Sequence, residues 1–294
     1  MTPSRWALLF AFLFSASTLP AQCTNDHREN KNAGILVTDF TITGTQTISA
    51  TDLAAITGEM IGSCYNEDSD EMEPRVRASF QNRGYFQVEV KSLRIKPRDP
   101  LDVPKPVTLE GEVSEGPQYR LAQVTFLKNH AFAAEELREQ FPLKNGALME
   151  REKIAMGLQS LRKLYVKRGY LDLVFVPETI LSSNATVNLN ISIDEGSQYH
   201  MGKLDIVAEK EAGARLRAEW KLAEGDVYDQ AYIDDYLTTA RDILPSNFTR
   251  ANVQITQNCP EALVQVRLMV DPAQDTSKSE PKNVPCEEHL KAPK

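Results

Sequence analysis

The sequence predicts an α+β protein made of three tandem β-α-α-β-β units, each a three-stranded mixed sheet with two helices on one face. Two repeated motifs and one repeated helical stripe support this prediction. The tripeptide Arg-Gly-Tyr occurs at residues 83–85 and 168–170, and the pattern Glu-Gly-X-Gln-Tyr occurs at residues 115–119 and again 80 positions later, at 195–199. The copies share one order of strand and helix patterns, which is typical of a repeat architecture.

The first unit is predicted over residues 34–120. Residues 35–44 alternate between apolar and polar side chains, as a half-buried strand does, and end at a glycine. Ser49, three residues before Asp52, is typical of a helix N-terminus, and a second helix is expected over residues 70–82. Two further strands, separated by a proline-rich loop, complete the unit.

The second unit is predicted over residues 121–200. A strand is expected at residues 121–127, a helix at residues 133–141, and a longer helix beyond Gly146. The longer helix carries apolar side chains at spacings of four, three and four, which form one stripe: Ile154, Leu158, Leu161 and Tyr165.

The third unit, residues 201–273, is a diverged copy. The apolar stripe shifted by 79 positions gives a second apolar set, namely Ile233, Leu237, Ala240 and Leu244. Strands are expected at residues 202–208, 252–256 and 263–270. Arg-Gly-Tyr is replaced here by Ser246-Asn247-Phe248.

We interpret the tripeptide as a structural joint. The glycine is expected to stop the preceding helix in the left-handed conformation, and the aromatic residue is expected to pack beneath the next strand. After glycine, asparagine is the residue that best tolerates that conformation. We therefore expect Asn247 to take the place of the glycine in the third unit. The expected joint residues are Gly84, Tyr85, Gly169, Tyr170, Asn247 and Phe248.

Residues 1–22 are expected to be a secretory signal peptide. One arginine precedes an apolar run from Trp6 to Phe14, and small residues and a proline follow it. A membrane anchor is the alternative, but the run is shorter than the roughly 20 residues that a spanning helix needs. We therefore expect an exported chain that is cut near Ala21 or Gln22.

Four cysteines without CxxC spacing favour disulfides over a zinc site in an exported chain: Cys23, Cys64, Cys259 and Cys286. Three pairings are possible. The pairing with local loops, Cys23 with Cys64 and Cys259 with Cys286, is our working hypothesis. A lipidated Cys23 is the alternative, but the bulky Gln22 precedes it and lipidation would leave an odd thiol.

Composition and spacing exclude several classes of function. The chain has 33 basic and 41 acidic residues and no basic stripe, so nucleic acid is not an expected partner. No serine, cysteine and histidine constellation for nucleophilic catalysis is visible. Glu115 and Glu195 precede glycines at strand ends, where turn chemistry explains them, and the acidic residues 66–73 lack the glycine of a calcium loop. We expect no catalytic residue, metal or cofactor.

The order of elements, with Arg-Gly-Tyr before the second strand and Glu-Gly after the third, resembles the POTRA (polypeptide-transport-associated) domain family over about residues 34–273. The resemblance implies a periplasmic module of outer-membrane protein assembly or two-partner secretion. In that family a client strand adds to an exposed sheet edge, commonly the second strand. The candidate edges are then residues 86–95, 171–176 and 253–256. The side chains expected to contact a partner are Phe86, Val88, Val90, Leu93, Leu171, Leu173 and Phe175.

We therefore expect a non-enzymatic scaffold or chaperone-like protein of the periplasm or cell envelope, peripheral to the outer membrane at most. Its expected partners are unfolded or partly folded outer-membrane proteins, or subunits of an assembly or secretion machine. Two alternatives stay open: an anchored envelope structural or cell-division protein, and a hydrolase with a site between units. Such arrays normally precede a membrane β-barrel, and residues 274–294, an expected disordered tail, are too few to form one.

Overall fold

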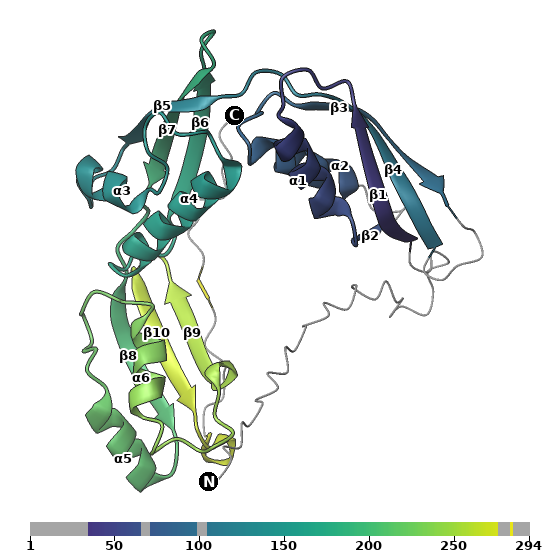
Figure 1. Ribbon diagram of the computed structural model, residues 1–294. Helices are drawn as coiled ribbons and strands as arrows, with labels where there is room; N and C mark the ends of the chain where they lie inside the picture. Colours follow the sequence, from purple (N-terminus) through teal and green to yellow (C-terminus); the bar gives the residue numbers. More distant parts are fainter. Residues whose placement is uncertain (1–34, 66–70, 99–104, 276–282, 285–294) are drawn as a thin grey trace, which may run out of the picture. The chain divides into compact units, whose positions relative to one another are not determined.

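A computed structural model of the chain describes residues 35–65, 71–98, 105–275 and 283–284 (Figure 1). The predicted signal segment, Cys23 and Cys286 lie outside the described residues. Three separate sheets follow one another along the chain, each with its own helices packed on one face. This confirms the predicted α+β class and its tandem β-α-α-β-β units. The chain divides into two compact units, Met1–Gln118 and Tyr119–Lys294.

The first compact unit holds one sheet with strand order β2-β1-β4-β3 in its described part. Its elements are β1 (Ile35–Thr43), α1 (Ala50–Met60), β2 (Cys64–Tyr65), α2 (Met72–Gln81), β3 (Glu89–Pro97) and β4 (Lys105–Ser114). β1 runs parallel to β4, and β3 runs antiparallel to β4. Strand β2 adds a fourth strand that the sequence does not predict, because two residues are too few to show a period.

Apolar side chains from the sheet and both helices form the core of this unit. Its fully buried members include Val37, Ile56, Val76, Phe80 and Leu109. Ser49 caps α1, since its hydroxyl oxygen accepts a hydrogen bond of 3.0 Å from the backbone N–H of Asp52. The predicted helix start is thus confirmed.

The second compact unit holds two sheets, with strand orders β5-β7-β6 and β8-β10-β9. The elements around the first of these sheets are β5 (Arg120–Leu127), α3 (Ala134–Gln140), α4 (Arg151–Val166), β6 (Val174–Leu181) and β7 (Thr186–Asp194). The elements around the other are β8 (His200–Val207), α5 (Lys210–Glu219), α6 (Tyr232–Thr239), β9 (Val253–Asn258) and β10 (Leu263–Met269). In both sheets the first strand is parallel to the central third strand, as in the first unit.

The predicted helical stripes face the cores of these two sheets. Leu161 and Tyr165 of α4 are fully buried, and so is Ile233 of α6. The two helices differ in length, with 16 residues in α4 and 8 in α6. In the third core the ring of Trp220 meets the ring of Tyr236 edge to face, with centroids 4.8 Å apart.

The second strands of the first two units begin later than the sequence predicts. The predicted starts were residues 86 and 171, whereas β3 begins at Glu89 and β6 at Val174. After the joint the chain makes a further turn that buries Val88 and Leu173, which are 5% and 2% exposed. Apolar residues in this turn continue the alternation of the strand, so the pattern does not reveal where pairing starts.

The expectation that Asn247 adopts a left-handed conformation is wrong. The described non-glycine residues with positive φ are Lys128, Ala185 and Ala262. Because α6 already ends at Thr239, the chain has left the helix before it reaches Asn247, and no left-handed stop is needed there. Phe248 is partly buried against the third core.

Candidate strand-binding edges and unit joints

The second strand of each unit lies at an edge of its sheet, but the edges of β3 and β6 differ in chemistry. Strand β3 presents exposed Lys91, Arg94 and Lys96, followed by Pro97. Lys91 and Lys96 also lie 3.8 Å from carboxylates of the neighbouring strand, those of Glu112 and Glu110. Lysine on an edge strand discourages pairing with another strand, so the lysines make β3 a protected edge.

Strand β6 is apolar and exposed along nearly its whole length. Val174, Val176 and Ile180 have exposed fractions of 45%, 57% and 45%, and Glu178 is the only charged residue of the strand. Pro177, in the middle of β6, has no backbone N–H to donate, but the strand carries no lysine. Its inner edge pairs in continuous antiparallel register with β7, from Val174 opposite Asp194 to Leu181 opposite Val187. No described strand pairs with its outer edge.

The predicted partner-contacting residues fall into two groups. Val88 and Leu173 belong to the cores. The ring of Phe175 packs edge to face on that of Tyr165, with the ring centroids 6.1 Å apart. Phe86, Val90, Leu93 and Leu171 are half-buried. The exposed apolar side chains of the edge are therefore residues that the sequence did not single out: Val174, Val176, Ile180 and Leu181. Strand alternation would have located them if the strand start had been placed correctly.

The edge of β9 is occupied at one end by the chain itself. Val284 forms a parallel bridge with Asn258. Within the expected disordered tail, residues 283–284 are thus described and bridge to β9, and the other residues beyond 275 lie outside the described part. The edge of β9 at Val253–Thr256, the sequence-predicted segment, has no strand partner among the described residues.

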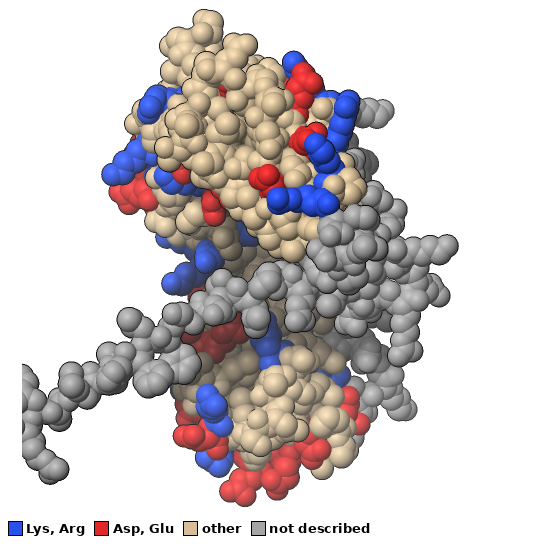
Figure 2. All heavy atoms as spheres, turned by 45° about the vertical axis from the view of Figure 1, so that its right-hand side comes forward, with Lys and Arg blue, Asp and Glu red and all other residues tan. Residues whose placement is uncertain are grey.

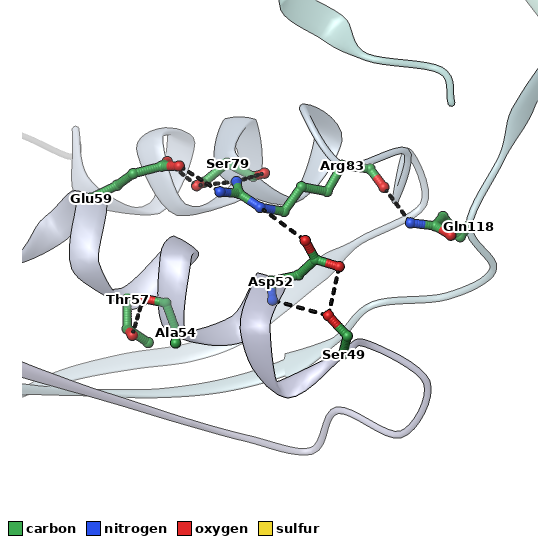
Figure 3. A network of polar contacts seen from close by, with 8 residues as sticks. All are labelled: Ser49, Asp52, Ala54, Thr57, Glu59, Ser79, Arg83 and Gln118. Carbon is green, nitrogen blue, oxygen red and sulfur yellow. Dashed lines mark hydrogen bonds and ion pairs between the residues drawn. The ribbon is translucent and has the colours of Figure 1, made fainter. Parts of the chain in front are cut away.

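The glycines of the two Arg-Gly-Tyr joints have the expected positive φ, 85° at Gly84 and 80° at Gly169. In the first joint Arg83 links the two helices (Figure 3). Its guanidinium lies 2.8 Å from Glu59 of α1 and donates to the carbonyl oxygen of Ser79 in α2 at 3.0 Å. Burial acts to raise the pKa of Glu59, but the hydrogen bonds of Ser79 and Arg83 outweigh it and lower that pKa.

The second joint is a seam between two units. The carbonyl oxygen of Gly169 accepts a hydrogen bond of 2.8 Å from the N–H of Tyr199, the residue that leads into β8. The Tyr199 hydroxyl donates to Asp172 Oδ2 at 2.6 Å, and the Gln198 amide donates to the Arg168 carbonyl at 3.0 Å. Arg-Gly-Tyr at residues 168–170 thus binds the Gln-Tyr pair that directly precedes β8 of the third sheet. The sequence held a signal for this contact, because both motifs recur together.

The glutamates of the two Glu-Gly motifs organise loops far away in sequence. Glu115 accepts hydrogen bonds from the N–H groups of Gln46 and Thr47 at 2.6 and 2.5 Å. Glu195 accepts from the N–H groups of His130 and Ala131, at 2.8 and 2.9 Å, and from the Tyr165 hydroxyl at 3.0 Å. The interpretation as turn residues was therefore incomplete, since each carboxylate holds the loop between the first strand and first helix of its unit.

The electrostatics of Glu115 follow from these contacts. Burial acts to raise the pKa of this carboxyl group, but the hydrogen bonds from the Thr47 and Gln46 backbone outweigh it, so its pKa lies below the ordinary value of 4.5. The charged form is therefore favoured in the folded protein.

The described residues contain no group of three or more His, Cys, Asp or Glu side chains arranged to hold a metal ion. Helices long and apolar enough to cross a membrane are likewise not found in the described part of the chain. Neither Cys64 nor Cys259 is a free thiol. On the face shown in Figure 2, basic and acidic side chains are interspersed.

The chain repeats a two-layer unit of one sheet with helices on one face, and comparisons with known proteins identify this kind of domain. Residues 119–196 match the POTRA family, described as a surface antigen variable number repeat. Over 80% of this chain, the fold is similar to the crystal structure of the Haemophilus influenzae BamA POTRA3-5 segment, with a TM-score of 0.56, 18% identity and coverage of 96% of that chain. The chain thus has the fold of a tandem array of POTRA-like units, one of which matches the POTRA family.

Two curated relatives carry names that concern outer-membrane assembly. A protein of Treponema pallidum (strain Nichols), described as an outer membrane protein assembly factor, is 28% identical over 165 residues, which are 55% of this chain and 20% of that protein. The outer membrane protein assembly factor BamA of Neorickettsia risticii (strain Illinois) is 22% identical over 58% of this chain and 23% of its own length. The chain thus spans about a fifth of the length of each relative.

Proposed function

We propose that this chain is a non-enzymatic protein of the bacterial envelope that acts in outer-membrane protein assembly and binds extended polypeptides by strand addition. The observation that carries the proposal is the exposed apolar edge of β6. An unpaired edge offers backbone N–H and C=O groups to any extended segment, and this edge adds apolar side chains on both faces. The contrast with the lysine-bearing edge of β3 argues against chance exposure, because edges are ordinarily protected.

The names of the curated relatives support the setting of this activity. Proteins on their way to the outer membrane are rich in segments of alternating apolar and polar residues, which are suited to lie along such an edge. We infer that the partners are unfolded or partly folded outer-membrane proteins, or subunits of the assembly machine. The corresponding location is the periplasm, after removal of residues 1–22 as a signal peptide.

Introducing a charge at Val176 tests this proposal. We expect Val176→Lys to weaken binding of an extended outer-membrane strand peptide about tenfold or more, ~1.4 kcal/mol, because lysine disfavours pairing at an edge. Met156→Lys is the matched control, since Met156 is an equally exposed apolar residue, at 53%, but lies on helix α4. Fluorescence anisotropy with a labelled peptide measures both affinities.

A photo-crosslinking amino acid at the same two positions gives the cellular readout. Position 176 is expected to capture outer-membrane proteins or assembly subunits, and position 156 is not. Equal capture at both positions, or equal affinity of both lysine variants, would contradict binding at β6.

We also propose that the four cysteines form the two local disulfides, Cys23 with Cys64 and Cys259 with Cys286. The N–H of Cys259 donates to the carbonyl oxygen of Val284 at 3.0 Å, and Cys286 follows Val284 by two residues in sequence. Peptide mapping by mass spectrometry without reducing agent should recover both crosslinked peptides from exported protein. Recovery of either crossed pairing, or of a lipid on Cys23, would show the hypothesis to be wrong.

A further inference from the structure

We propose that residues 271–275 form a latch at the end of the third unit, in which the carboxylate of Asp275 binds Arg267 of β10 and turns the chain back onto its own sheet. The latch stands where the first two units carry Glu-Gly-X-Gln-Tyr, and here it takes the place of a seam like that at Gly169. The inference goes beyond the proposed function, because it depends neither on strand addition nor on a bound polypeptide.

The sequence that follows the last strand is different in the third unit. Residues 195–199 read Glu-Gly-Ser-Gln-Tyr, whereas residues 271–275, which follow β10, read Asp-Pro-Ala-Gln-Asp. The glutamine is kept, but an aspartate takes the place of the tyrosine. In the second unit this tyrosine, Tyr199, donates a hydrogen bond to Asp172 at the seam. An ionised carboxylate accepts hydrogen bonds and donates none, so Asp275 cannot make the corresponding contact.

The residues before Asp275 form a turn that is capped from within. Pro272–Gln274 are a 3₁₀ helix. Asp271 Oδ1 accepts a hydrogen bond of 3.1 Å from the N–H of Ala273, which satisfies a donor at the start of this helix. Glu195, at the same place in the motif, instead accepts from a loop 64 and 65 positions earlier in the sequence. The shorter acidic side chain thus stabilises its own turn, and this turn places Asp275 beside the sheet.

Arg267 receives the carboxylate on the face of the sheet opposite the core. Its neighbours in the strand, Val266 and Leu268, are 1% and 0% exposed and point into the core, so Arg267 points to the other face. Its Nη2 lies 2.6 Å from Asp275 Oδ1, and its Nε lies 3.0 Å from Oδ2 of Asp205, the residue directly opposite on β8. One guanidinium therefore contacts both the neighbouring strand and the chain that follows its own strand.

The two carboxylates on Arg267 differ in burial. The side chain of Arg267 is 9% exposed, that of Asp275 is 26% exposed, and that of Asp205 is 59% exposed. An exposed ion pair contributes little to stability, whereas removing one partner of a buried pair leaves the other charge without compensation. We therefore expect the latch to depend on Asp275 much more than on Asp205.

Removing either partner of the buried ion pair tests the latch in the full chain. Asp275→Ala deletes the carboxylate, and Arg267→Met replaces the guanidinium by an apolar side chain that suits a buried position. The reporters are the amides of Asp271 and Gln274, whose N–H groups donate to the carbonyl oxygens of Val207 and Asp271 at 2.9 and 3.0 Å. We expect their protection from hydrogen exchange to fall at least about tenfold in both variants. The double variant should lose no more protection than either single variant, because the two side chains act through one interaction.

Two further variants serve as controls. Asp205→Ala removes the other carboxylate on the same guanidinium, and we expect it to change the protection of these amides by less than about twofold. Asp275→Tyr restores the residue that the motif carries in the first two units. We expect it to lose protection as Asp275→Ala does, since a neutral tyrosine cannot replace the ion pair. Unchanged fluorescence of Trp220 in each variant shows that the third core is intact.

Unchanged protection of the two amides in Asp275→Ala, or full protection in Asp275→Tyr, would overturn the inference. An equal loss in Asp205→Ala, or additive losses in the double variant, would overturn it as well. If Arg267→Met unfolds the unit, the comparison of Asp275→Ala with Asp205→Ala still decides, because both carboxylates lie partly at the surface. None of these results bears on peptide binding at β6, so this inference and the proposed function fail separately.

Discussion

Replacing Gly169 with alanine is expected to destabilise the seam between the second and third units by about 3 kcal/mol, since a left-handed alanine costs about 1–2 kcal/mol and a backbone clash adds to it. Gly169 has φ +80°, and a Cβ placed there would lie 2.5 Å from the carbonyl oxygen of Tyr199. No flexible side chain can yield at this point, so either the joint or the entry to β8 must move.

Gly225→Ala is the matched control for this variant. Gly225 has a similar φ of +90°, but a Cβ there would meet nothing within 4 Å. Gly225→Ala is therefore expected to lower the free energy of unfolding only by the cost of a left-handed alanine, about 1 kcal/mol. Urea unfolding followed by the fluorescence of Trp220, which lies in the third core, compares the two variants. Equal losses of unfolding free energy would mean that Gly169→Ala costs only the left-handed conformation, and that the predicted clash with Tyr199 does not destabilise the seam.

Replacing Glu115 with glutamine is expected to cost about 2 kcal/mol at pH 7, because hydrogen bonds to a charged acceptor are worth about 1.5–3 kcal/mol and a neutral amide oxygen replaces only part of that. The loss should localise to the loop at Gln46 and Thr47, whose N–H groups donate hydrogen bonds to the carboxylate. Urea unfolding gives the free energy, and amide hydrogen exchange at these two residues gives the local effect. Glu112→Gln, at an exposed position on β4, the strand that ends just before Glu115, should change stability by less than about 0.5 kcal/mol.

The effect of Glu115 should depend on pH in a defined direction. Its pKa in the folded protein lies below the ordinary value of 4.5, so its stabilisation is fully present above pH 4.5 and is lost as the pH falls through the lower folded value. The difference between the wild type and Glu115→Gln should therefore be largest near neutral pH and shrink in acid. A difference that stays constant down to acid pH would contradict a role for the charge.

The features that could be predicted from the sequence are those that depend on local pattern. The stripe of α4 and the left-handed glycines of the joints each follow from spacing or from one residue's conformational freedom, and each is confirmed. Local pattern did not predict that Val88 and Leu173 are buried in turns and not part of the strands. An apolar residue in a buried turn and an apolar residue in a strand look alike in sequence, and only the tertiary contact decides between them.

Long-range polar contacts were not visible for a related reason. Glu115 contacts loop residues that lie 68 and 69 positions earlier in the sequence, and a local sequence pattern cannot predict a contact over that separation. The Asn247 expectation failed because it assumed that α6 has the length of α4, whereas the diverged helix ends early. The exposed edge of β6 could not be separated from that of β3 before the strand starts were known, since a small shift changes which side chains face outward.

The seam at Gly169 also bears on how such chains can be taken apart or recombined. Half of it, Gly169, lies between α4 and β6, and the other half, Gln198 and Tyr199, lies between β7 and β8, beyond the last strand of the second sheet. A cut at the apparent boundary would leave Gly169 facing solvent and Tyr199 without the Asp172 that fixes its hydroxyl. The piece that can be transplanted intact is therefore offset from the sheet-and-helix unit and carries its Gln-Tyr pair along with the preceding sheet.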